Sequence, residues 1–408
     1  MIDSGGPKNF SQERRWTAYL FCLAAAACLG GIVLLPPESM AEEIDRVYIV
    51  RALQMAIISF ALASVLTPAA IFAANKLGIL DEPTEARKIH KAPMPLLGGV
   101  AIYAALAVTI IYNFHFSLQL KGVALGGTVM MLVGLIDDVR PLSSRLRLLA
   151  QLAATAILIR HDVCLTFLPE TGWGHIGRIA LTAFWVVGIV NAFNFIDGMD
   201  GLATGLAAIA AMCFFAIAFQ TRQAYLAFLT IALFGSCLGF LPYNFHRARI
   251  FLGSAGSNFL GFTLAGIAVM GGWAAHRPLV SFSVPVLILG VLIYDMIHIT
   301  VDRILKGKVT SFREWTDYVG RDHFHHRLLR LGLSQRQAAL LIYFISGCLG
   351  IGAIVLRSNA GNAVLLLIQA SIILSVVTVL INVNPSCAET DERDGPRRDP
   401  EDPDGPAS

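Results

Sequence analysis

The chain has 408 residues, of which 56% are hydrophobic and only 14% are charged, and its formal net charge is +3. This composition leaves too little polar surface for a soluble globule of this size. So small a net charge also gives no reason to expect a nucleic-acid partner. Apolar runs of about 20 residues recur along the chain, the length that crosses a bilayer as a helix. The composition therefore predicts an all-α, polytopic membrane bundle surrounded by the lipid bilayer.

The apolar runs predict about 11 to 12 transmembrane helices. The first run ends in LLPPESMAEE, and we expect it to be retained as a helix; cleavage as a signal peptide near Ala41 is the alternative. The candidate spans cover roughly residues 16–36, 48–75, 96–113, 119–136, 147–160, 178–190, 202–220, 224–241, 257–274, 279–300, 338–356 and 363–382.

The distribution of charge predicts the domain organisation and the orientation. Residues 1–383 are expected to form a single integral-membrane domain, whereas the charged, Pro- and Gly-containing tail at 384–408 is expected to be disordered. If the N-terminus is cytoplasmic and the spans alternate, 23 of the 31 Lys and Arg residues lie on the cytoplasmic side, as the positive-inside rule requires. We therefore expect a multi-pass protein of the inner (plasma) membrane with its polar motifs on the cytoplasmic side. A twelve-span transporter is an alternative, but the two halves show no convincing self-similarity.

Acidic residues cluster at the ends of separate apolar runs. The segment NAFNFIDGMDGLATG, 191–205, carries Asp197 and Asp200, and the pair Asp137-Asp138 ends another run. Ionisable groups at membrane depth are costly and are usually retained for function. Carboxylates also suit a hard divalent cation. The pattern predicts one shared, metal-binding polar site; the alternatives are ordinary helix caps and a solvated acidic helix end.

Two further segments are rich in cations or imidazoles, which can bind phosphate groups. The alternative for both is a basic, interfacial loop that contacts anionic head groups. The first segment is RKIH, with Arg87, Lys88 and His90, and the second is DHFHHR, with His323, His325, His326 and Arg327. A third feature is Asp295 with His298, which share a helical face; a functional pair and a structural hydrogen-bonded pair are both open readings.

Five motifs, four of which contain residues named above, occur in one order between about residues 77 and 334. Together they resemble the polyprenyl-phosphate N-acetylhexosamine-1-phosphate transferases of the glycosyltransferase family 4 type. The DHFHHR and RKIH segments are most similar to the branch that uses UDP-GlcNAc and undecaprenyl phosphate. The motifs are RKIHKAPMPLLGG from Arg87, LIDDVRPLSSRLRLLAQ from Leu135, NAFNFIDGMDGLATG from Asn191, FLGSAGSNFLGF from Phe251 and GRDHFHHRLLRLGLS from Gly320.

The resemblance implies a reaction: transfer of a sugar 1-phosphate, with GlcNAc-1-phosphate expected, from a UDP-sugar to polyprenyl (undecaprenyl) phosphate, with release of UMP. This would be the first membrane step of a cell-surface polysaccharide pathway. It implies Mg²⁺ as cofactor, with Mn²⁺ as the alternative, and a homodimer as one assembly to test. The implied catalytic residues are Asp137, Asp138, His323, His325 and His326. The implied substrate-binding residues are Arg87, Lys88, His90, Asn191, Asp197, Asp200 and Arg327, and the implied metal ligands are Asp137, Asp138 and Asn194.

One position departs from the pattern of this family. The family usually has Asp in a GDxGS motif, where it is regarded as a magnesium ligand, but this chain reads GSAGS with Ser254 in the acidic position. Ser keeps a neutral oxygen and removes a charge. The alternative function is therefore a catalytically weakened relative of the family, or a lipid or solute transporter.

Overall fold

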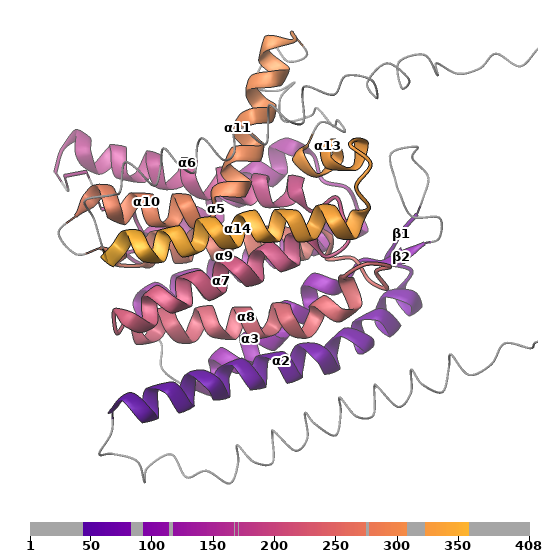
Figure 1. Cartoon of the computed structure of the whole chain (residues 1–408), viewed down its shortest axis with the longest axis horizontal. Coiled ribbons are helices and arrows are strands. Elements are labelled where there is room, and N and C mark those ends of the chain that lie inside the picture. The colour runs from indigo at the N-terminus through magenta and orange to yellow at the C-terminus, as the bar shows by residue number, and fades with distance from the viewer. Residues whose placement is uncertain are drawn as a thin grey trace, which may run out of the picture.

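The computed structural model describes residues 44–82, 93–113, 117–166, 168–169, 171–274, 277–307 and 323–358. Most helices run back and forth beside one another (Figure 1). Two short strands, β1 (Leu80–Asp81) and β2 (Met94–Pro95), pair antiparallel. The helices are α2 (Ile44–Leu77), α3 (Gly98–Asn113), α4 (Leu118–Val139), α5 (Ser144–Arg160), α6 (Trp173–Ile196), α7 (Leu202–Gln220), α8 (Ala224–Asn244), α9 (Gly253–Met270), α10 (Pro278–Ile288), α11 (Gly290–Leu305), α13 (Phe324–Arg330) and α14 (Gln335–Ser358).

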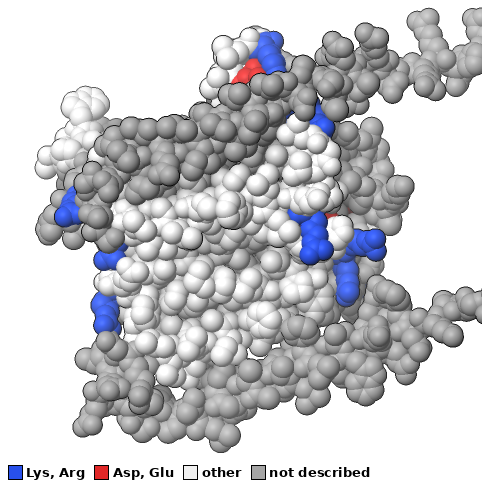
Figure 2. All heavy atoms as spheres, viewed as in Figure 1, with Lys and Arg blue, Asp and Glu red and all other residues white. Residues whose placement is uncertain are grey.

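The predicted all-helical membrane architecture is confirmed. Seven of the described helices are long and apolar enough to cross a bilayer, or eight spans if the bent pair α10 and α11 is counted as one. Every predicted span between residues 48 and 356 coincides with a helix, although α3 and α5 are shorter than the others. Figure 2 shows a broad central band without Lys, Arg, Asp or Glu between two charged ends. The predicted spans at 16–36 and 363–382, and the tail at 384–408, lie outside the described residues.

The predicted span at 279–300 is broken into two helices. The chain bends by 81° between α10 and α11, and α11 stands nearly perpendicular to its neighbours in Figure 1. Pro285 lies inside α10 and has no N–H to donate to the preceding turn, and Gly290 follows the break. Both residues weaken a continuous helix, so the apolar pattern continues through a point where the backbone does not.

Alternating helix directions gather the polar motifs at one end of the bundle. The C-terminal ends of α4, α6 and α8 lie there with the N-terminal ends of α5, α7 and α9, and with α13 and the β1–β2 pair on the right of Figure 1. We call this the motif end. The predicted convergence of the motifs is thus confirmed for their described residues.

Close backbone contacts hold the helices together at the motif end. A Cβ atom on Gly134 of α4 would collide with the backbone of Ser254 and Ala255, and one on Gly99 of α3 would collide with Gly256. Because glycine has no Cβ, α3 and α4 can both approach the start of α9. This approach sets the distance between the acidic end of α4 and the GSAGS segment.

Candidate active site

Asp138 joins the end of α4 to the start of α9. Its Oδ1 accepts a hydrogen bond from the backbone N–H of Ser254 (2.7 Å), and its Oδ2 accepts one from that of Ala255 (3.0 Å). The first N–H groups of a helix lack partners within the helix and favour a negative charge. Gly253 precedes them with φ +73°, and a Cβ there would lie 2.7 Å from Asp138 Oδ2. The carboxylate is therefore fixed in position by the backbone of the GSAGS segment.

Asp137 has different partners from its neighbour. Its Oδ1 accepts a hydrogen bond from the backbone N–H of Leu142 (2.7 Å), and its Oδ2 lies 3.9 Å from a guanidinium nitrogen of Arg147. Successive helical residues point about 100° apart, so Asp137 faces the turn into α5 while Asp138 faces α9. The two adjacent carboxylates occupy different environments.

Asp197 directly follows α6 and is the least satisfied carboxylate at the motif end. Burial raises the pKa of Asp197 well above its usual range, and the nearby negative charge of Asp138 raises it further. No group in the described part of the chain donates a hydrogen bond to its carboxylate. A buried anion beside another anion is unstable unless it takes up a proton or a cation. Asp138 and Asp197 are therefore two residues here that could hold a cation.

The polar residues near Asp197 in the sequence bond to other segments of the protein. The amide of Asn194 donates to Ser257 Oγ on α9 (3.1 Å), and the amide of Asn191 donates to Gln151 Oε1 on α5 (3.0 Å). Asp200 Oδ2 accepts a hydrogen bond from the backbone N–H of Ala248 (3.0 Å). Asn191 and Asp200 thus tie neighbouring segments together, and their substrate-binding roles stay predictions.

Helix α13 places the histidines against the loop that follows α6. His323 precedes α13, and its Nδ1 lies 3.0 Å from Asp295 Oδ2. His325 is fully buried, and a Cβ on Gly198 would lie 2.8 Å from His325 Nε2. The rings of His325 and His326 have centroids 4.2 Å apart. The structure therefore brings His325 and His326 against Gly198, the residue that follows Asp197 in the chain.

His325 carries no charge in this setting. Burial lowers the pKa of His325 well below its usual range, and the neighbouring His326 and His323 lower it further. Neither ring nitrogen has a partner within the described residues. An unpartnered buried polar group costs free energy, which is recovered if a bound ligand supplies the missing hydrogen bond.

Stability should therefore fall as the pH is lowered through the range in which an unfolded histidine takes up a proton, about pH 6.5. The folded-state pKa of His325 is below the unfolded value, so the unfolded chain binds the proton first. We expect the melting temperature in detergent to drop between pH 7.5 and 5.5, and His325→Gln to remove part of that drop. An unchanged pH dependence in the variant would contradict the buried, neutral state of His325.

The four cationic residues predicted to bind substrate are not seen at the site. Arg327 bonds to another residue of the protein, and the other three lie outside the described residues. Arg327 donates to Asp302 Oδ2 on α11 (3.2 Å) and is largely buried. Arg87, Lys88 and His90 lie outside the described residues, which resume on each side at β1 and β2. The positions of these three residues are thus untested, and Arg327 has a protein partner.

Three residues outside the predicted site organise it, and of these only Asp295 was singled out from the sequence. Asp295 bonds to His323 and to the backbone N–H of Phe324 (2.8 Å), not to His298 as its helical spacing suggested. Gln151 and Ser257 hold the two asparagines of the α6 motif. A polar side chain inside an otherwise apolar span was the available signal for all three residues.

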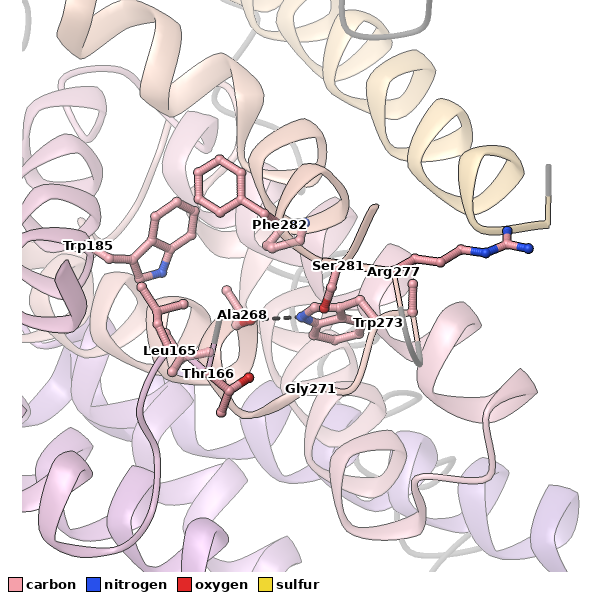
Figure 3. A pocket seen from close by; sticks show the side chains of 12 residues that line it. Leu165, Thr166, Trp185, Ala268, Gly271, Trp273, Arg277, Ser281 and Phe282 are labelled. Carbon is pink, nitrogen blue, oxygen red and sulfur yellow. Dashed lines mark hydrogen bonds between the residues drawn. The ribbon is translucent and has the colours of Figure 1, made fainter. Parts of the chain in front are cut away.

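A pocket at the other end of the bundle is separate from this site. It lies between the end of α9, the start of α10 and the loop before α6, and it is lined by Trp185, Trp273 and Phe282 (Figure 3). The indole N–H of Trp273 donates to the carbonyl of Ala268 (2.7 Å). None of the predicted site residues lines this pocket, so the chemistry is concentrated at the motif end.

The chain is similar to known proteins over most of its length. Residues 120–272, from α4 through α9, match the model of glycosyl transferase family 4. The chain is 33% identical over 311 residues to a probable undecaprenyl-phosphate N-acetylglucosaminyl 1-phosphate transferase of Bacillus subtilis, covering 74% of this chain and 84% of that protein. It is 32% identical to a decaprenyl-phosphate N-acetylglucosaminephosphotransferase of Mycobacterium leprae, covering 75% and 84%.

A third relative, from Escherichia coli K12, is an undecaprenyl-phosphate alpha-N-acetylglucosaminyl 1-phosphate transferase that is 30% identical over 286 residues, covering 66% of this chain and 74% of that protein. The match to the family model spans the acidic ends of α4 and α6 and the start of α9, which the structure brings together. With identity at this level over most of the length of its relatives, the chain belongs to glycosyl transferase family 4, the family of the polyprenyl-phosphate GlcNAc-1-phosphate transferases.

Proposed function

We propose that the protein transfers GlcNAc-1-phosphate from UDP-GlcNAc to a polyprenyl phosphate and releases UMP. The observation that carries the proposal is the meeting of Asp138, Asp197 and the α13 histidines at one end of the bundle. Two phosphorylated substrates must come together there, and transfer of a phosphoryl group depends mainly on positioning and on charge stabilisation. The names of the relatives support the choice of sugar and lipid.

The residues present fit a divalent cation. No three His, Cys, Asp or Glu side chains form a ready-made cage within the described part of the chain, but Mg²⁺ typically uses one or two carboxylates and keeps several waters. Asp197 and Asp138 would hold it, with Asn194 and Asp137 nearby. When bound, the cation would offset charge on the diphosphate of the UDP-sugar.

The protein's own side chains can orient the two substrates. Asp137 is held by Leu142 and Arg147 and keeps a largely buried carboxylate that can orient the acceptor phosphate or take its proton. His325 is neutral and has two open ring nitrogens, so it can bond to a phosphate or sugar group without adding charge. The apolar surroundings strengthen these contacts.

The test is UMP release by purified protein supplied with UDP-GlcNAc, polyprenyl phosphate and Mg²⁺, with UDP-GalNAc as the competing sugar donor. The structure offers Asp162→Asn as a matched control, because Asp162 is exposed at the other end of the bundle and its positive φ suits Asn. Asp137→Asn is the expected loss-of-function variant. No UMP from the wild type with either donor would refute the proposal.

A second candidate function is a family member that binds these substrates without reacting. Ser254 carries it, because the backbone N–H of that residue bonds to Asp138 and its side chain therefore sits beside the proposed cation site. Tight binding of UDP-GlcNAc without release of UMP would select this candidate over the enzyme.

The proposed orientation places the motif end in the cytoplasm, where UDP-sugars are made. In a variant whose seven native cysteines are replaced by Ser, we expect Ser334→Cys at the motif end to resist an impermeant maleimide added to intact cells. Asp162→Cys, at the other end, should react. The reverse labelling pattern would show that the orientation is inverted.

A further inference from the structure

Asp295 is a buried carboxylate that the proposed reaction has not yet used. It lies in α11 with 3% of its surface exposed, at a depth where an ionised group needs strong partners. Both of its oxygens are occupied. Oδ2 accepts from His323 Nδ1 at 3.0 Å, and Oδ1 accepts from the backbone N–H of Phe324 at 2.8 Å. The carboxylate thus binds the first histidine and the first turn of α13 at the same time.

The bond to His323 determines where the ring carries its proton. An ionised carboxylate can only accept hydrogen bonds, so Nδ1 of His323 must be the donor. In the neutral ring Nε2 is then the acceptor nitrogen, as in other histidines oriented by a carboxylate. Within the described residues no protein group bonds to that Nε2, and it is therefore available to a substrate group.

The surroundings of His323 connect this bond to the proposed site. Its ring lies 5.4 Å from the ring of Phe195, near the end of α6, and 5.8 Å from that of His325, centroid to centroid. The rings of His323 and His325 are stacked, with an interplanar angle of 15°. His323 therefore forms one wall of the space that holds His325 against Gly198, and a shift of His323 would also displace His325.

The bend between α10 and α11 makes this contact. Because α11 turns away from α10 by 81°, it approaches α13 rather than continuing along the bundle. Tyr294, beside Asp295, meets the ring of Phe324 edge-on at 6.4 Å. Further along α11, Asp302 holds Arg327 of the same short helix. Two acidic residues of α11 thus hold α13, one at its first residue and the other at Arg327 in its middle.

We propose that Asp295 is a positioning residue for the transfer reaction, which fixes the tautomer and the place of His323. The inference rests on the proposed function for its kinetic consequence, whereas the Asp295–His323 contact itself can be tested without activity. A residue of this kind acts through its partner, so its effect on the rate should disappear when the partner is absent.

Asp295→Asn separates this role from simple capping of α13. The Asn carbonyl can still accept from the Phe324 N–H, but the Asn amide would donate to His323 Nδ1 and force the proton onto Nε2. We expect kcat for UMP release to fall by about 10-fold to 100-fold, with the KM for UDP-GlcNAc changed by less than about twofold. Asp295→Glu keeps the charge and should recover part of the rate, and Asp162→Asn should leave it unchanged.

The double variant Asp295→Asn with His323→Ala provides the decisive comparison. It should be no slower than His323→Ala alone. The proposal would be overturned if the fold-losses in kcat of the two single variants multiply in the double variant. A normal kcat in Asp295→Asn, or an Asp295→Glu variant no faster than Asp295→Asn, would also overturn it.

A second cycle uses melting temperatures and needs no turnover. It compares the wild type, Asp295→Asn, His323→Ala and the double variant. If the effects of the two substitutions on the melting temperature are not additive, the contact is real. If the wild type also releases no UMP, the proposed function has failed although the contact is present. Additive melting effects would show that the contact is absent. Should Asp295→Asn fail to fold, Asp295→Glu combined with His323→Ala replaces it in both cycles, with the same expected non-additivity.

Discussion

Asp197→Asn is expected to abolish most UMP release and at the same time to raise the melting temperature of the protein. The carboxylate is buried beside Asp138, and both effects raise its pKa well above the usual range. At neutral pH its ionised form therefore costs stability in the folded protein relative to the unfolded chain. Asn removes that charge at nearly constant volume. Loss of a cation ligand should lower the rate by roughly 100-fold or more, since such ligands contribute several kcal/mol to the transition state.

Magnesium distinguishes this account from a general effect on stability. A ligand that binds only the folded state raises the melting temperature, so Mg²⁺ should stabilise the wild type and should have much less effect on Asp197→Asn. Asp200→Asn is the matched control. Its carboxylate accepts a hydrogen bond from the Ala248 N–H, and the neutral Asn oxygen accepts that bond more weakly, so this variant should melt slightly below the wild type. An Asp197→Asn protein that melts below the wild type, or that gains as much from Mg²⁺, would contradict the assignment.

The helices and their common polar end could be predicted because both follow from local physics. Apolar runs of sufficient length must become helices in a bilayer, where each backbone group needs a partner within its own segment. Short connections then make successive helices antiparallel, so every second turn lies at the same end. For this reason the acidic ends of α4 and α6 and the GSAGS start of α9 were expected on one side, where the structure places them.

The break at α10–α11 and the partner of Asp295 could not be predicted in this way. Hydropathy is nearly the same for a straight and a broken span, and a single Pro does not always break a helix. With a straight helix, His298 is the natural partner of Asp295, one turn away. Because the chain bends by 81° between α10 and α11, α11 meets α13, and Asp295 bonds to His323, which is 28 residues distant in the chain. The inner hydrogen bond between Asn191 and Gln151 likewise depends on how α5 and α6 pack.

Ser254→Asp is expected to lower the Mg²⁺ concentration needed for half-maximal transfer, by about tenfold if one added ligand contributes about 1.4 kcal/mol. Position 254 lies in the first turn of α9, and its backbone N–H donates to Asp138, so a carboxylate there would lie beside the proposed cation site. A helix N-terminus tolerates a negative charge well. Without Mg²⁺, however, the new charge would repel Asp138 and Asp197, and the variant should melt below the wild type.

Ser254→Asn is the control for this prediction, because it matches the size of Asp and adds no charge. It should leave the Mg²⁺ requirement close to that of the wild type, which can retain activity through Asp138 and Asp197 and through the diphosphate of the bound UDP-sugar. If the wild type releases no UMP at any Mg²⁺ concentration whereas Ser254→Asp does, Ser254 marks a chain that binds substrates but lacks one cation ligand for turnover. If the substitution changes neither the Mg²⁺ dependence nor the rate, the side chain of residue 254 does not reach the cation, and the carboxylates of α4 and α6 hold it without help from α9.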